Sequence, residues 1–303
     1  MKNEKKIRKI ISIIIGIIIV LFILLNGDFI SNATASVSNI NNSNENNNVD
    51  GSLSVHFIDV GQGDCIYINQ GEYNMLIDAG NNEDGEKLVS YLKSLNVNGF
   101  DYVIGTHPHE DHIGGMDDII NNFEIENYYM PDKLSTTKTF EDVLDALDAK
   151  DLSYNVPKID DEFKLGDATF KVIYSGDDTN DINDSSIVLK MTYGDNSFLF
   201  TGDATSNVEE IILNKDIKSD VLKVAHHGSS YSSTTEFLDK VNPKYAVISV
   251  GKNNSYNHPA SITLQKLSNR DIKVYRTDLD GTIIFTSDGT NLSVQTNKTD
   301  TNG

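Results

Sequence analysis

The sequence is poor in cysteine, because Cys65 is the only one among its 303 residues. A single cysteine cannot form a disulfide within the chain, so a small fold held together by disulfides is excluded. Cys65 begins the strand-like run Cys65-Ile66-Tyr67-Ile68, where a small core residue is a better interpretation than a nucleophile. The stability of the chain must therefore come from something other than covalent cross-links.

Basic residues are also scarce. Residues 51–303 hold 20 Lys and Arg against 41 Asp and Glu, a net charge of −21. Such acidity keeps a protein soluble, repels polyanions at long range, and argues against nucleic-acid binding led by contacts to the phosphate backbone. Lysines such as Lys215, Lys218 and Lys223 are interspersed with acids, so the sequence indicates no basic groove.

Long apolar runs are rare as well, because only residues 10–25 form one, interrupted by Ser12 and Gly16. As a helix these sixteen residues would span about 24 Å, which is long for a signal-peptide core and slightly short for a membrane span. Five basic residues precede the run: Lys2, Lys5, Lys6, Arg8 and Lys9. This flank is expected to stay in the cytoplasm, with the rest of the chain outside the cell or on the outer face of the cytoplasmic membrane.

The N-terminal segment has two interpretations. Ala33-Thr34-Ala35 offers a small-x-small cleavage site, so residues 1–30 are either a cleaved signal peptide or an uncleaved membrane anchor. No cysteine lies nearby, so a lipoprotein is not expected. Residues 31–50 are rich in Asn and Ser, which predicts a disordered linker. Residues 51–296 then form one domain large enough to bury a core, and residues 297–303 form a disordered tail.

Histidine is uncommon too, yet three of the seven histidines fall in Thr106-His107-Pro108-His109-Glu110-Asp111-His112, which we call the histidine loop. An apolar, strand-like run precedes it, and Gly114-Gly115 and a helix-like run follow. Imidazoles and carboxylates this dense are hard to explain as core packing, because each must be hydrogen-bonded or bound to metal. Zinc, manganese or iron would use them together, so the loop predicts a metal site rather than a solvated polar loop.

The HxHxDH pattern followed by two glycines resembles the signature of the metallo-β-lactamase superfamily. The whole set of motifs is most similar to the soluble metallohydrolase domain of ComEC-type DNA-uptake competence proteins. Besides the histidine loop, the motifs are Phe57-Ile58-Asp59-Val60-Gly61-Gln62-Gly63-Asp64, Leu76-Ile77-Asp78-Ala79-Gly80, Asn183-Asp184-Ser185-Ser186-Ile187-Val188-Leu189, Leu199-Phe200-Thr201-Gly202-Asp203, Leu222-Lys223-Val224-Ala225-His226-His227-Gly228-Ser229 and Asn257-His258-Pro259. The resemblance covers roughly residues 53–287. It does not extend to a whole competence channel, which has many membrane spans where this chain has at most one.

The pattern of apolar residues predicts an α/β fold. Strands are expected at 53–59, 65–69, 73–78, 101–106, 168–174, 186–193, 197–202, 220–225, 245–250, 272–276 and 281–286, with a last strand around 292–294. Helices are expected at 85–95, 114–122, 138–150, 205–214, 234–241 and 260–269. Mixed hairpins and crossovers indicate two sheets packed face to face with helices outside. The resemblance implies the metallo-β-lactamase-like αββα sandwich itself.

The resemblance implies two divalent metal ions in the histidine loop. His107 and His109 would bind the first, and Asp111 and His112 would bind the second. Local geometry agrees for three of these residues, because alternate residues of an extended loop point to the same side, so His107, His109 and Asp111 can converge.

Two later motifs complete the implied ligand set. Asp203, at the end of an apolar strand, would bridge the metals, and the alternative is a helix N-cap ahead of residues 205–214. One histidine of the pair His226-His227 would be the last metal ligand. Adjacent strand residues point to opposite faces, so only one is expected to bind metal. His226 directly ends the expected strand and is preferred, which leaves His227 to orient substrate or support a ligand.

The chain departs from the superfamily at its third motif, which normally supplies another histidine. No histidine lies between His112 and His226, and the matching segment is Asn183-Asp184-Ser185-Ser186. The first metal would then be weakly bound, or have oxygen ligands, or use a water as a ligand. Fewer nitrogen ligands shift the preference toward manganese, so the choice between zinc and manganese stays open.

Other residues are expected around the metals. His258 either contacts the substrate, as a proton donor or a phosphate ligand, or has a structural role at a helix start. Asp78, at a strand end, is expected to hydrogen-bond a ligand histidine. The resemblance implies that the glycine-rich turn with Asp59, Gln62 and Asp64 lines the site. Ser185 and Ser229 complete the residues expected to support ligands or contact the substrate.

These expectations define an extracytoplasmic metal-dependent hydrolase, with Asp111, Asp203 and His258 as its catalytic residues. Two metals can lower the pKa of a shared water and supply hydroxide at neutral pH, which favours a phosphodiesterase. DNA, nucleotides and cell-wall phosphodiesters are the candidate substrates, and no nucleotide cofactor is expected. The alternative is a non-catalytic or weakly metal-binding surface module in DNA uptake or envelope assembly.

Overall fold

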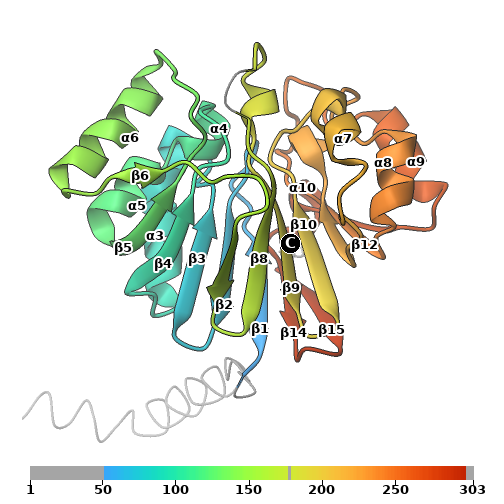
Figure 1. Ribbon diagram of the computed structural model, residues 1–303, viewed down its shortest axis with the longest axis horizontal. Helices are drawn as coiled ribbons and strands as arrows, with labels where there is room; N and C mark the ends of the chain where they lie inside the picture. Colours follow the sequence, from blue (N-terminus) through green and yellow to red (C-terminus); the bar gives the residue numbers. More distant parts are fainter. Residues whose placement is uncertain (1–50, 177–178, 298–303) are drawn as a thin grey trace, which may run out of the picture. The chain divides into compact units, whose positions relative to one another are not determined.

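The fold is known from a computed structural model, which describes residues 51–176 and 179–297. These residues form two mixed β-sheets packed face to face, with helices on the outer side of each sheet (Figure 1). The predicted α/β class and the αββα sandwich are therefore confirmed. The apolar run of residues 10–25 lies outside the described residues. Within the described ranges, no helix is long and apolar enough to cross a membrane.

The first sheet has eight strands in the spatial order β15-β14-β1-β2-β3-β4-β5-β6. The strands from β15 through β3 pair antiparallel, whereas β3, β4, β5 and β6 run parallel to one another. The strands are β1 (Leu53–Phe57), β2 (Ile66–Gln70), β3 (Tyr73–Ile77), β4 (Gly99–Ile104), β5 (Glu124–Tyr129), β6 (Tyr154–Asn155), β14 (Ile283–Ser287) and β15 (Leu292–Thr296).

The second sheet has seven strands in the order β13-β12-β11-β10-β9-β8-β7. Here β10, β11, β12 and β13 are parallel, and the tight turn after Tyr193 joins the antiparallel pair β9 and β10. The strands are β7 (Glu162–Leu165), β8 (Ala168–Tyr174), β9 (Val188–Tyr193), β10 (Asn196–Phe200), β11 (Val221–Lys223), β12 (Tyr245–Ile248) and β13 (Lys273–Arg276).

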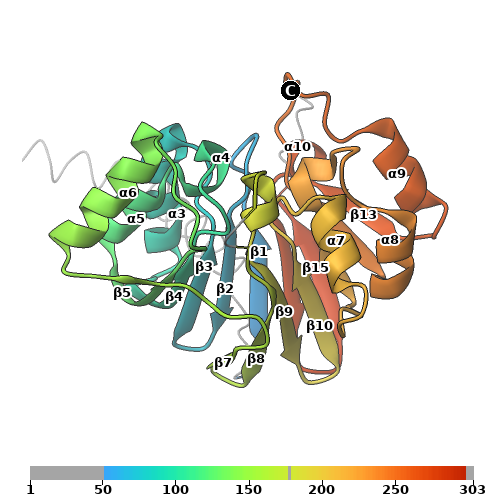
Figure 2. The ribbon, with the colours of Figure 1, turned by 45° about the horizontal axis from the view of Figure 1, so that its top comes forward.

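The helices cover the outer faces of the two sheets. α3, α5 and α6 lie on the first sheet, and α7, α8 and α9 lie on the second (Figures 1 and 2). The helices are α3 (Gly85–Ser94), α4 (Glu110–Ile113), α5 (Met116–Asn122), α6 (Lys138–Ala149), α7 (Ser206–Ile212), α8 (Thr235–Val241), α9 (Ser261–Ser268) and α10 (Thr277–Asp280), with short 3-10 turns η1 (Asn82–Asp84), η2 (Asn183–Ser185) and η3 (Ala225–Gly228).

Alternation along the strands explains the layers. In β1, Leu53, Val55 and Phe57 belong to the core between the sheets, while His56 points to the helical side and contacts Tyr91 of α3. A second apolar core lies between the first sheet and its helices, and a third lies between the second sheet and its helices. Most of the strands predicted from the sequence are recovered because this alternation is local.

Some elements differ from the prediction. β5 was missed because its sequence, Glu-Ile-Glu-Asn-Tyr-Tyr, contains residues that are depleted in strands, and only its contacts to β4 and β6 select the extended form. The strand expected at 220–225 stops at Lys223, and the chain then turns through η3. This early end changes the geometry of His226 and His227.

The carboxyl ends of four strands meet at one edge of the sandwich. Asp78 follows β3, the histidine loop follows β4, Asp203 follows β10, and the histidine pair follows β11. Parallel neighbours end at the same edge, so each sheet brings two of these segments together. The backbone N–H of His226 donates to the carbonyl of Gly202, which ties the last two segments directly.

Candidate metal centre

The histidine loop leaves β4 and enters the short helix α4. The backbone N–H and the hydroxyl of Thr106 both donate to the carboxylate of Asp78, at 2.8 and 2.7 Å, which fixes the start of the loop. His109 caps α4, so Asp111 and His112 lie in its first turn. The loop is thus not extended throughout, and the helix rather than strand alternation brings Asp111 toward the histidines.

Side chains from three loops bring possible metal-ligand atoms together in two overlapping groups. One group is His107, His112 and Asp203, and the other is Asp111, His112 and His227; within each group the ligand atoms lie within 4.8 Å of one another. The His112 Nε2 atom lies 3.2 Å from Asp203 Oδ1, and the His227 Nε2 atom lies 3.1 Å from Asp111 Oδ2. We call these five residues the histidine–carboxylate cluster. Imidazole nitrogens and carboxylate oxygens at this density are a donor set that suits zinc or manganese.

Unpaired buried atoms in and beside the cluster test whether a metal fits. Asp203 Oδ1, His112 Nε2 and Asp64 Oδ1 are withdrawn from solvent and make no hydrogen bond. Buried polar atoms in folded proteins almost always have a partner, because leaving one unpaired costs about 1–3 kcal/mol. A divalent cation would satisfy the first two atoms at once, so the residues present fit a metal.

His112 is oriented by Asp78. The two side chains are 2.8 Å apart between Nδ1 and Oδ2, so a proton on Nδ1 leaves Nε2 free to face the cluster. Burial alone would lower the pKa of His112, but the carboxylates of Asp203 and Asp78 outweigh it and raise the pKa well above its usual value. Burial would likewise raise the pKa of Asp203, but His227 and His112 hold it well below its usual value, so the carboxylate is ionised.

Beneath the cluster lies a buried ion pair that the sequence analysis missed. Lys223, named above only as a lysine interspersed with acids, is just 1% exposed. Its Nζ atom lies 2.6 Å from Asp64 Oδ2, while Asp64 Oδ1 lies 3.4 Å from His227 Nδ1. Burial would raise the pKa of Asp64, but Lys223 and His227 lower it. The signal available in the sequence was a lone lysine inside the apolar run of β11.

The structure distinguishes the two adjacent histidines. His227 is buried, and its Nδ1 donates to the carbonyl of Ser249 at 2.9 Å, which leaves Nε2 facing Asp111. His226 is partly exposed, and its Nε2 lies 3.8 Å from Asp203 Oδ2. This geometry favours His227 over the expected His226 as the ligand beside Asp111. Strand alternation does not apply, because both residues have left-handed backbones with φ of 51° and 52°.

The third-motif segment supplies hydroxyl and amide groups in place of the absent histidine. The Ser186 hydroxyl lies 3.4 Å from His107 Nδ1 and accepts the backbone N–H of Asp203 at 3.1 Å. Ser185 is buried and donates instead to the carbonyl of Ile182, so it does not reach the cluster. Asn183 is one of the residues that line a cavity next to the cluster. No separate role was predicted for Ser186 or Asn183, although both belong to the third motif.

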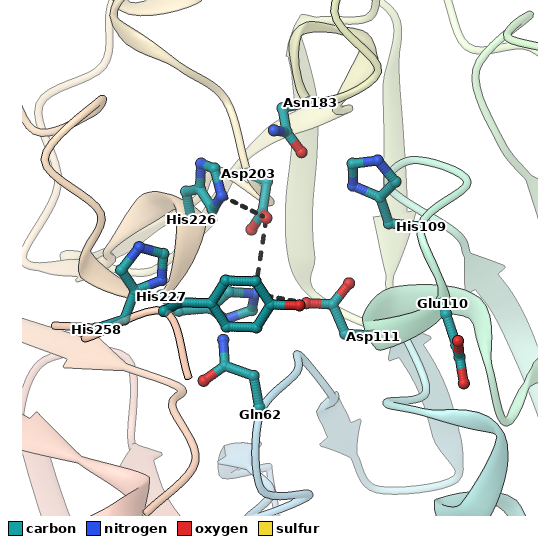
Figure 3. Close-up of a pocket in the computed structure, with 10 residues that line it drawn as sticks. Gln62, His109, Glu110, Asp111, Asn183, Asp203, His226, His227 and His258 are labelled. Carbon is teal, nitrogen blue, oxygen red and sulfur yellow. Dashed lines mark hydrogen bonds and ion pairs between the residues drawn. The ribbon is translucent and has the colours of Figure 1, made fainter. Parts of the chain in front are cut away.

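A cavity of about 250 Å³ opens onto the cluster. Figure 3 shows Asp111, Asp203 and the histidine pair around the cavity, with Asn183 above Asp203 and His109 at the upper right. His109 lies 3.1 Å from His107 between ring nitrogens but outside the two groups of possible ligands. The lining residues are Gln62, His109, Glu110, Asp111, Asn183, Asp203, His226, His227, Tyr256 and His258.

The remaining expected residues divide between the cavity and its surroundings. Gln62 lines the cavity and accepts the backbone N–H of Gly251 through Oε1 at 3.2 Å. Asp59 is exposed and accepts the N–H of Gly61, so this part of the glycine-rich turn does not line the site as expected. Ser229 is buried behind the histidine pair, where its hydroxyl accepts the N–H of Tyr231.

Comparison with known proteins adds to this geometry. A profile of the metallo-beta-lactamase superfamily matches residues 58–252. The chain is 34% identical over 252 residues to ComE operon protein 3 of Bacillus subtilis, covering 76% of this chain and 32% of that protein. It is 29% identical over 231 residues to Competence protein ComA of Neisseria gonorrhoeae, covering 75% and 31%. The chain thus spans about a third of the length of these curated relatives.

Solved structures with similar folds are more distant in sequence. The metallo-beta-lactamase fold protein YhfI of Bacillus subtilis superposes with a TM-score of 0.54 at 13% identity, covering 78% of this chain and 100% of YhfI. A mutant of the CmlA beta-hydroxylase superposes with a TM-score of 0.51 at 12% identity, covering 77% and 53%. Because the second protein is a hydroxylase, the shared fold does not determine the reaction.

Proposed function

This chain belongs to the metallo-beta-lactamase superfamily, and we propose that it is a metal-dependent hydrolase that cleaves phosphodiesters outside the cytoplasm. One observation carries the proposal: a buried histidine–carboxylate cluster contains two unpaired ligand atoms, and Asp111, Asp203 and His227 of the same cluster line an open cavity. Unsatisfied buried ligands beside a cavity lined with polar groups are expected of a catalytic site.

Two divalent metals, zinc or manganese, are the proposed cofactors. His107, His109 and Asp203 would hold the first, and Asp111, His112 and His227 would hold the second, with Asp203 between them. Divalent ions bound there would lower the pKa of a water and neutralise charge on a phosphate. Asp78 would keep His112 in its metal-binding orientation. Lys223 would hold Asp64, which lies beneath His227, in place through their ion pair.

The cavity residues would bind and orient the substrate. Burial, together with the neighbouring His226 and His227, lowers the pKa of His258 to about 4, so its ring is neutral at pH 7. A neutral imidazole can donate one hydrogen bond to a phosphate oxygen, and this role fits better than release of a proton. Asn183 and Gln62 add amide donors on two other sides of the cavity.

The proposed location follows from the basic flank and the apolar run of residues 10–25, either as a signal peptide or as an anchor that holds the enzyme at the membrane. The candidate substrates are DNA, nucleotides and cell-wall phosphodiesters. The resemblance to DNA-uptake competence proteins favours DNA, and one relative is named Competence protein ComA. The net charge of −21 in residues 51–303 disfavours any substrate that must be held along several phosphates.

The test uses the full chain, purified in detergent without chelator. We would count bound metals by elemental analysis and measure hydrolysis of bis-p-nitrophenyl phosphate with added zinc or manganese. Asp203→Ala should abolish turnover, because the Asp203 carboxylate lies within 4 Å of four histidine side chains. The exposed Asp59→Ala is the matched control and should leave turnover unchanged. Two metals with Asp203-dependent turnover are expected.

The second candidate is the non-catalytic or weakly metal-binding surface module. It is favoured by the hydroxyl of Ser186 beside His107, where the superfamily normally supplies a histidine. At most one metal, with no turnover under either ion, would support this candidate and reject the hydrolase. Retention of turnover in Asp203→Ala would reject the proposed ligand set.

A further inference from the structure

Tyr256 is an exposed aromatic side chain at the entrance of the cavity. It is 65% exposed and lines the cavity together with His258 and Gln62. A single exposed ring on a protein surface needs no explanation by itself. Its position beside the histidine–carboxylate cluster, in a loop held in place by hydrogen bonds, calls for one.

The loop that carries Tyr256 is held by the side chain of Asn254. The Asn254 Oδ1 atom accepts the backbone N–H groups of Tyr256 and His258, at 3.2 and 3.0 Å. Its Nδ2 atom donates to the carbonyls of Gly251 and His258. Gly251 in turn donates to Gln62, which also lines the cavity. The backbone is thus fixed, and the ring is presented to solvent without a large loss of entropy on binding.

The Tyr256 ring continues a series of rings that reaches the cluster. Its centroid lies 5.8 Å from that of His258, and the two planes are inclined by 25°. The His258 ring lies 6.5 Å from His227, inclined by 30°. A planar group placed against Tyr256 would therefore be in the same approximate orientation as the rings that lead to the proposed metal ligands. Offset stacking of this kind is the preferred arrangement of flat rings.

The charges of the cavity indicate how a substrate must be held. Its lining includes Glu110, Asp111 and Asp203 but, among the described residues, no lysine or arginine. Proteins that follow a nucleic-acid backbone rely on such cations, so this cavity can accept one phosphate at the metals but not a series of them. The remaining affinity must come from the uncharged part of the substrate. Polyol phosphates of cell walls offer no planar ring for this purpose, whereas nucleobases do.

We propose that Tyr256 is a stacking platform that selects phosphodiesters with a nucleobase next to the phosphate bound at the cluster. This inference rests on the proposed function, because the cluster must place the phosphate. Tyr256 determines specificity and takes no part in bond cleavage. The preferred substrate is then a nucleotide ester or an unpaired end of a nucleic acid, since bases in a duplex already stack on each other.

The test measures binding to the metal-loaded full chain by calorimetry. Two phosphorothioate tetramers that resist hydrolysis serve as probes, one of thymidine and one of abasic tetrahydrofuran units with the same charge. Stacking on an aromatic side chain predicts at least about fivefold tighter binding of the thymidine tetramer. Tyr256→Ala should remove this ratio and Tyr256→Phe should keep it. Tyr231→Ala is the matched control, because Tyr231 is 74% exposed and lies outside the cavity lining.

Each outcome separates the inference from the proposed function. Equal binding of both probes by the unaltered chain, no binding of either, or an unchanged ratio in Tyr256→Ala would overturn the role of Tyr256, even if bis-p-nitrophenyl phosphate is hydrolysed. A Tyr256-dependent ratio without any hydrolysis would keep the stacking platform and reject the phosphodiesterase. Loss of the ratio in Tyr231→Ala as well would also count against the platform, because both exposed tyrosines would then act alike.

Discussion

The Nζ atom of Lys223 lies 2.6 Å from Oδ2 of Asp64, and both side chains are almost fully withdrawn from solvent. Breaking a buried ion pair by removing one partner is costly, because the remaining charge is left without compensation. This pair also lies directly behind His227, through the second oxygen of Asp64. The structural support of the candidate metal centre therefore includes a positive charge that does not face the cavity.

Lys223→Met should lower the free energy of unfolding by about 3–5 kcal/mol, because Asp64 would be buried without its cation. Urea denaturation would measure this change. Lys244→Met is the control, since Lys244 is exposed and pairs with Asp220 at 3.0 Å, so its loss should cost less than about 1 kcal/mol. Similar costs for the two variants would show that the buried pair does not stabilise the fold.

Asp78→Asn should weaken metal binding about 10- to 100-fold, because the amide cannot orient His112 and support its basicity as the carboxylate does. Asparagine tolerates the left-handed backbone at this position, where φ is 61°, so the fold should survive. A chelator competition titration gives the metal affinity. Asp59→Asn, in the exposed turn, should bind metal as the unaltered chain does. An Asp78→Asn affinity within twofold of that control would exclude the supporting role.

His56 should make the protein sensitive to acid. Burial lowers its pKa to about 4, from 6.5 for the free side chain, so the unfolded chain binds a proton more readily than the folded one. The contribution of neutral His56 to the free energy of unfolding is complete above pH 6.5. It is lost as the pH falls toward 4, which lowers the free energy of unfolding by about 3 kcal/mol in total. Unfolding free energies at pH 7 and 4.5 would measure the loss. His56→Gln should show a smaller loss, and an equal loss would exclude His56 as its source.

Gly114→Ala should destabilise the protein and reduce its metal content. A Cβ atom at Gly114 would lie 2.2 Å from the backbone nitrogen of Asn82 and 2.3 Å from the carbonyl carbon of Asn81, and neither can move easily. Relief of the clash would displace α4, which carries Asp111 and His112, at a cost of at least about 1–3 kcal/mol. Thermal denaturation and elemental analysis would measure both effects.

Gly85→Ala is the matched control for Gly114. There the added Cβ would lie 2.0 Å from Asp118 Oδ2, which rotation of that side chain relieves, and 2.8 Å from Asp118 Cβ, which requires a small shift. Both close contacts at Gly114, in contrast, are with backbone atoms. Its cost should be well below that of Gly114→Ala. If both variants unfold at the same temperature, the close contact between Gly114 and the backbone of Asn81 and Asn82 does not limit the size of the side chain at Gly114.

Parts of the candidate site could be predicted because they are local in the sequence. The histidine loop places four possible ligands within six residues, so any fold brings them near each other. Asp78 and Asp203 were identified as residues at strand ends, and the motifs place them in a known order. Asp59 was expected at the site by the same argument, yet it turns to solvent, because a motif does not determine which side of a loop faces the cavity.

By itself the sequence determined the chemistry and the layers: which residues can bind a metal, and which strand residues face the core between the sheets. These follow from side-chain type and from alternation, which are local properties. Only the tertiary structure decided that His227 faces Asp111, that Lys223 is buried against Asp64, and that Tyr256 stands beside His258. Those contacts depend on left-handed backbone at the histidine pair and on loops from two sheets meeting at one edge, and neither is encoded by any single segment.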